Sequence, residues 1–129
     1  MIFILYNGEI MLDKGNTMSA GSYDMFIDQG SDFAIEFQIS EDGVFRDLTG
    51  FFVRAQIRLS KVSSNVAATF TCYVSDALEG KIEVTLPNSE SKKLFAGKYS
   101  YDIELYTAGD ATVNRIIQGN ITVSSEVTR

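Results

Sequence analysis

The chain of 129 residues contains no histidine, no tryptophan, one cysteine and one proline. Without histidine it lacks the most common general base and the most common metal ligand in proteins. Its single cysteine, Cys72, can form no intramolecular disulfide and cannot build a zinc site that needs several thiolates. These absences exclude histidine-based catalysis and zinc sites made from histidine or several cysteines.

Positive charge is also scarce, because 11 basic residues stand against 17 acidic ones and give a net charge of -6. An acidic chain with a pI of about 4.5 is repelled by a phosphate backbone and by an anionic lipid surface. We therefore expect neither nucleic acid nor a membrane to be its main partner.

Long apolar runs are missing as well. The N-terminal run Ile2–Tyr6 is too short for a secretory signal or a membrane span. We expect the protein to stay in the compartment where it is made, and a free cysteine is compatible with a reducing cytoplasm. Hydrophobic residues nevertheless make up 45% of the chain, which at this length predicts one globular unit with its own core.

Short runs of alternating apolar and polar residues dominate the chain from residue 23 onward. Such period-two alternation is typical of strands that bury one face, and helical spacing is almost absent. The alternating runs cover residues 23–27, 33–39, 53–59, 66–74, 82–86, 99–105 and 117–123. The stretch 88–95 has a capping residue followed by helix formers, with Gly97 after it, and predicts one or two helical turns.

These elements predict an all-β fold. We expect an immunoglobulin-like antiparallel β-sandwich of about seven strands, with one short helical turn and an N-terminal hairpin or arm. A small barrel is the alternative. The tryptophan and the cysteine pair of true immunoglobulin domains are absent, so the patterns predict the architecture and not the topology. In the clearest strand, we expect Val53, Ala55, Ile57 and Leu59 to face the core.

The run 66–74 places Cys72 among its apolar positions. With no cation nearby to favour the thiolate, we interpret Cys72 as a small buried hydrophobic residue. Residues 66–73 are also β-prone, uncharged and free of proline. If this run forms a sheet edge, we expect the chain or a partner to cover it, because bare edges of this kind promote aggregation.

The N-terminal segment carries a separate signal. Asn7 and Gly8 lie between residues 2–6 and 9–12, and Asn-Gly between two apolar runs is typical of a β-hairpin. Both faces of the first strand are apolar, so it should pack on its own sandwich or on another chain. We therefore divide the chain into an arm, residues 1–17, and a sandwich domain, residues 18–129. The alternative is that the arm is an extension upstream of an internal start at Met18.

Candidate catalytic groups are few. Ser91 and Lys92 are adjacent and project apart, which does not suit a Ser-Lys pair. Glu36, Asp102 and Glu104 occupy polar faces of predicted strands, as acids on any solvated sheet do. The acidic turns at 41–43 and 47–50 offer too few oxygen ligands for calcium. We therefore expect no enzymatic activity, no catalytic residues, no cofactor and no metal site.

Five segments carry a resemblance to a known family. They are IDQGSDF at 27–33, DLTGFFVRAQIR at 47–58, GKIEVTL at 80–86, AGKYSYDIEL at 96–105 and GNITVSSEVTR at 119–129. In this order and spacing, the chain resembles immunoglobulin-like bacteriophage virion proteins. These include the N-terminal domain of upper baseplate proteins and related small tail and baseplate proteins. The resemblance covers all but the first twenty or so residues. The chain departs from the family in its apolar arm and in the pair Phe51-Phe52, where one aromatic residue would suffice.

The resemblance implies a non-enzymatic structural component of a virion, made in the host cytoplasm and assembled into the tail or baseplate. Its partners would be other virion proteins and copies of itself in a symmetric assembly. The alternatives are a capsid decoration protein and a carbohydrate-binding adsorption module that uses exposed tyrosines. For the contacts with partners we expect these residues: Ile2, Phe3, Ile4, Leu5, Tyr6, Phe51, Phe52, Tyr73 and Tyr106.

Overall fold

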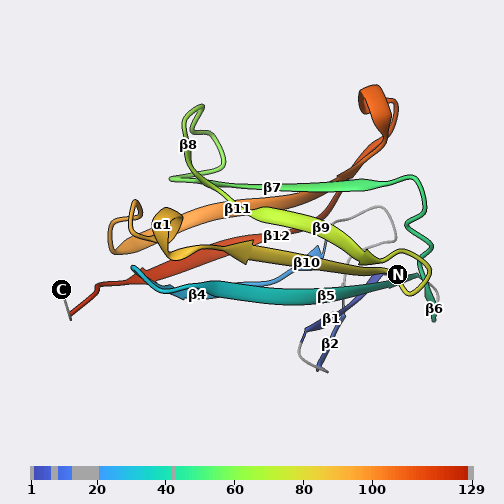
Figure 1. Cartoon of the computed structure of the whole chain (residues 1–129), viewed down its shortest axis with the longest axis horizontal. Coiled ribbons are helices and arrows are strands. Elements are labelled where there is room, and N and C mark those ends of the chain that lie inside the picture. Colours follow the sequence, from blue (N-terminus) through green and yellow to red (C-terminus); the bar gives the residue numbers. More distant parts are fainter. Residues whose placement is uncertain (1, 7–8, 13–20, 42, 128–129) are drawn as a thin grey trace.

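A computed structural model describes residues 2–6, 9–12, 21–41 and 43–127, and it consists of two packed sheets (Figure 1). The first sheet has the order β2 (Glu9–Leu12), β1 (Ile2–Tyr6), β5 (Phe33–Glu41), β10 (Lys81–Leu86) and β9 (Thr71–Asp76), and β6 (Val44–Phe45) also pairs with β5. The second has the order β3 (Gly21–Ser22), β12 (Val113–Ser124), β11 (Gly97–Tyr106), β7 (Phe52–Arg58) and β8 (Val66–Thr69), and β4 (Met25–Asp28) also pairs with β12. The all-β sandwich is confirmed.

The core lies between the sheets and follows the alternation in the sequence. In β11 the side chains of Tyr99, Tyr101, Ile103 and Leu105 are buried, while the residues between them are partly exposed. Strands β5 and β10 alternate in the same way. One expectation is wrong: β7 ends at Arg58, so Leu59 lies beyond the strand and 67% of it is exposed.

The run 66–74 is divided between the two sheets. Strand β8 pairs with β7 in the second sheet, and β9 pairs with β10 in the first. The chain changes sheets at Phe70, which is buried and donates its backbone N–H to the carbonyl of Ala55 at 3.1 Å. Both strands are edges, and each pairing contains a register shift, which limits further pairing at an edge. Coverage of this edge in an assembled particle stays a prediction.

Most pairings are antiparallel, but β12 runs parallel to β3 and β4. Between these two short strands the chain passes over Gly119, where Tyr23 donates its backbone N–H to the Gln118 carbonyl at 3.0 Å. The Tyr101 hydroxyl donates a hydrogen bond to the carbonyl of Tyr23. The alternation in the sequence predicted a strand here without its direction.

The helical connection between β10 and β11 crosses from the first sheet to the second. Helix α1 covers Asn88–Ser91, which is one turn and agrees with the expected one or two turns. Gly97 then opens β11 with a φ of +144°, a conformation that favours glycine.

The N-terminal strands extend the first sheet of their own chain. Strand β1 pairs antiparallel with β2, and it pairs antiparallel with β5 in a register that sets Ile4 opposite Ile39. The predicted turn at 7–8 and the remainder of the arm lie outside the described residues, as do the side chains of Ile2, Phe3, Ile4, Leu5 and Tyr6. The role of residues 1–17 in assembly therefore stays a prediction.

Candidate interaction surface

The outer face of the second sheet carries an exposed row of apolar side chains at one end. The pairings of β11 with β7 and β12 set Tyr106 opposite Phe52 on one side and opposite Val113 on the other. Phe52 is 53% exposed, Val113 is 42% exposed, and the rings of Phe52 and Tyr106 lie 5.6 Å apart between centroids. We call Phe52, Tyr106 and Val113 the apolar row.

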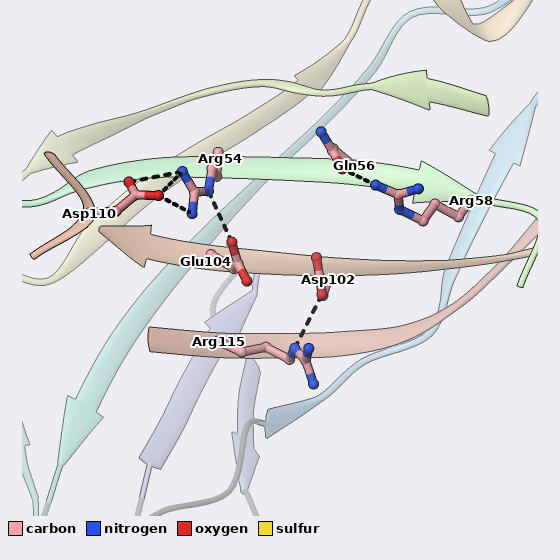
Figure 2. Close-up of polar contacts among 7 residues, drawn as sticks. All are labelled: Arg54, Gln56, Arg58, Asp102, Glu104, Asp110 and Arg115. Carbon is pink, nitrogen blue, oxygen red and sulfur yellow. Dashed lines mark hydrogen bonds and ion pairs between the residues drawn. The ribbon is translucent and has the colours of Figure 1, made fainter. Parts of the chain in front are cut away.

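Arg54 forms a charged network with Glu104 and Asp110 (Figure 2), next to Tyr106 of the apolar row. Its Nε donates to Oε1 of Glu104 at 2.9 Å, and Nη1 donates to Oδ1 of Asp110 at 3.2 Å. The guanidinium lies over the ring of Tyr106, 4.4 Å from its centroid. The hydrogen bonds to Glu104 and Asp110 raise the pKa of Arg54, which is protonated in any case.

This network fixes the tip of the β11–β12 hairpin. Asp110 belongs to η1 (Ala108–Asp110), which projects away from the two layers (Figure 1). Because Arg54 comes from the neighbouring strand β7, its ion pair with Asp110 ties the projecting tip to the sheet. The apolar row therefore lies on a restrained part of the surface.

Farther along the same face, polar side chains surround a depression of about 280 Å³. Arg58, Lys61, Asp102 and Arg115 are among the residues that line it. Nε of Arg115 pairs with Oδ2 of Asp102 at 3.1 Å. Nη2 of Arg58 donates to Oε1 of Gln56 at 2.9 Å (Figure 2), and its Nη1 donates to the Ser63 carbonyl at 3.1 Å. We call this hollow the cationic depression.

The predicted contact residues are brought together only in part. Phe52 and Tyr106 are neighbours, whereas Tyr73 lies on β9 in the other sheet. Phe51 is half-buried against the core, with the Arg46 guanidinium 5.2 Å from its ring centroid. Two members of the surface, Val113 and Arg54, are absent from the residues predicted from sequence.

A bulge explains why Val113 was missed. The register of β11 and β12 shifts between Ile103 and Glu104, which leaves Ile116 as an extra residue in β12. Ile116 and Ile117 are both buried, so the residues before the bulge face opposite to what alternation from Ile117 predicts. Val113 also lies before the predicted run 117–123, so nothing in the sequence indicated that it would join Tyr106 on the outer face.

The groups considered for catalysis lie apart. Glu36 is on β5 in the first sheet, whereas Asp102 and Glu104 are on β11 in the second and pair with arginines. The Ser91 hydroxyl is buried and donates to the Ser31 carbonyl at 2.8 Å, while Lys92 is exposed. Within the described ranges, no group of three or more His, Cys, Asp or Glu side chains is placed to hold a metal ion. In the same part of the chain, no helix has the length and apolar character needed to cross a membrane.

Cys72 packs partly buried against the core, as its place in the alternation predicts. Burial raises the pKa of its thiol to about 11. Since the thiolate is the reactive form, we expect a disulfide reagent at about pH 8 to label the folded protein about a hundredfold more slowly than the unfolded chain. Absorbance of the released thiol measures both rates, and equal rates would contradict this placement of Cys72.

No family model matches the sequence, and no curated protein matches it either. Among solved structures, the chain is similar to the crystal structure of CopC from Methylosinus trichosporium OB3b, with a TM-score of 0.47 and 9% identity. The match covers 82% of this chain and 88% of that chain. A likeness at this level gives the chain no function.

Proposed function

We propose that this protein is a non-enzymatic structural component of a bacteriophage virion, located in the tail or baseplate. In this proposal it uses the outer face of its second sheet to contact a neighbouring virion protein. The resemblance of the five segments between residues 27 and 129 supports the virion, and the apolar row supports the contact.

The apolar row is the single observation that carries the contact. Phe52 and Val113 expose about half of their surfaces, 53% and 42%, side by side with Tyr106 at one end of the sheet face. Aromatic side chains and arginine are enriched in protein interfaces, where a few such residues supply most of the binding energy. Arg54 is already held by Glu104 and Asp110, so a partner would not have to order it.

The adsorption alternative has less support from the geometry. Tyr73 and Tyr106, the tyrosines suggested for glycan binding, lie on different sheets and cannot stack against one sugar chain together. A head decoration protein would use the same kind of exposed face. The tail assignment therefore depends on the resemblance to tail and baseplate proteins.

The N-terminal arm is a second proposed contact. Its pairing with β5 leaves the outer edge of β2 as one end of the first sheet. In an assembled particle, this edge can accept a strand from a neighbour, because main-chain hydrogen bonding at sheet edges is a common mode of recognition.

The proposal is tested by separating heads from tails in virions of the phage that encodes this chain, followed by quantitative mass spectrometry. We expect peptides of this protein in the tail fraction at a constant ratio to other tail proteins. Enrichment in the head fraction would support the decoration alternative, and absence from both fractions would refute a structural role.

A further inference from the structure

The cationic depression has more positive charge than its own carboxylate balances, because Arg58, Lys61 and Arg115 line it together with Asp102. Arg115 is paired with Asp102, but no carboxylate in the described part of the chain forms an ion pair with Arg58 or Lys61. The bonds from Arg58 to Gln56 and the Ser63 carbonyl hold its guanidinium in place and leave other N–H groups available. A partly immobilised guanidinium beside a lysine suits the binding of carboxylates.

The outer face of the first sheet has the opposite imbalance, an excess of negative charge. The pairing of β5 with β10 sets Glu36 directly opposite Glu83. Like charges at opposed positions destabilise a sheet, and within the described residues no cation pairs with either carboxylate. Lys81 lies two residues from Glu83 on the same strand and forms no ion pair with it.

The surroundings of this acidic pair are suited to contact with another flat face. Tyr73, from β9, donates its hydroxyl to Oε2 of Glu83 at 2.6 Å, and half of its surface is exposed. Its neighbours on this face are small: Ala34, Thr71 and Thr85. We call Glu36, Glu83 and Tyr73 the acidic row.

We propose that copies of this chain stack head to tail, with the acidic row of one copy on the cationic depression of the next. The charges favour a second copy as the occupant. The cationic depression and the acidic row belong to the same chain, carry opposite charge and lie on the outer faces of different sheets. Such a contact is heterologous: it uses a different face of each of the two copies. The face that each copy has left can bind a further copy, so the stack continues as a ring or a column. This inference concerns purified protein and does not depend on the proposed place in a virion.

Charge reversal on each face separately provides the test. One variant carries Arg58→Glu and Lys61→Glu, and a second carries Glu36→Lys and Glu83→Lys. A control, Lys92→Glu with Lys93→Glu, changes the net charge as the first variant does but lies at α1, away from both faces. Far-UV circular dichroism checks that each variant is folded. Sedimentation velocity then measures association at about 0.02 M and about 0.5 M salt, concentrations at which charges are weakly and strongly screened.

We expect the wild type and the control to associate at low salt and to dissociate at high salt. Each reversed variant alone should lose association by at least about tenfold in affinity. An equimolar mixture of the two should regain it, because each then offers the face that the other requires. If the variant with Glu36→Lys and Glu83→Lys is unfolded, Glu36→Gln with Glu83→Gln takes its place in the test, and it should also lose association. A wild type that stays monomeric at low salt would overturn the proposal, as would reversed variants that associate like the wild type or a mixture that does not.

Discussion

We expect replacement of Gly119 by alanine to lower the free energy of unfolding by about 3 kcal/mol or more. A Cβ at this position would overlap the backbone carbonyl of Tyr23, which crosses Gly119 between β3 and β4. The peptide of Tyr23 would have to move away. It would then lose its hydrogen bonds with Gln118 and Tyr101, and the edge-on contact of its ring with Phe37 at 5.7 Å would weaken.

Urea unfolding followed by circular dichroism measures this effect, and Tyr101→Phe provides a graded comparison. That variant removes only the hydrogen bond to Tyr23, so we expect it to cost about 1 kcal/mol. If Gly119→Ala lowered the free energy of unfolding no more than Tyr101→Phe does, the backbone of Tyr23 would not lie as close to Gly119 as described.

The second large effect concerns assembly. We expect Phe52→Ala to reduce incorporation of the protein into virions by at least about tenfold, because it removes the most exposed member of the apolar row. The free energy of unfolding should fall by less than about 1 kcal/mol, because the substitution removes only an exposed cross-strand contact with Tyr106. Quantitative mass spectrometry of particles that carry the variant measures the incorporation.

Phe95→Ala is the matched control. Phe95 is 81% exposed and lies between α1 and β11, away from the apolar row. The Phe95→Ala variant should be incorporated into virions as well as the wild type. Equal incorporation of the Phe52 and Phe95 variants would show that the apolar row is not part of the assembly interface.

Strand positions could be predicted from the sequence because alternation records which side chains are buried. Ile35, Phe37 and Ile39 face the core as their spacing predicts. Alternation does not record which sheet a strand joins. The run 66–74 changes sheets at Phe70 without losing its period, because both sheets direct the same positions toward the common core. The direction of β4 was hidden for a related reason, since parallel and antiparallel strands bury side chains with the same period.

The candidate surface was less predictable than the fold. Phe52 and Tyr106 were expected as contact residues, but their proximity depends on the long-range pairing of β7 with β11. Val113 joins them only because of the bulge at Ile116. Arg54 alternates with the buried residues Val53 and Ala55, and nothing in its local sequence indicates that Asp110, 56 residues away, would hold it.

An electron cryomicroscopy map of the assembled tail is the most direct test of the central claim, that this chain is a virion subunit with its second sheet turned toward a neighbour. We expect density for the two-layered sandwich in several symmetry-related copies, with Phe52, Tyr106 and Val113 covered by an adjacent virion protein. A tail map without this sandwich, or one in which the apolar row faces solvent in every copy, would contradict the account.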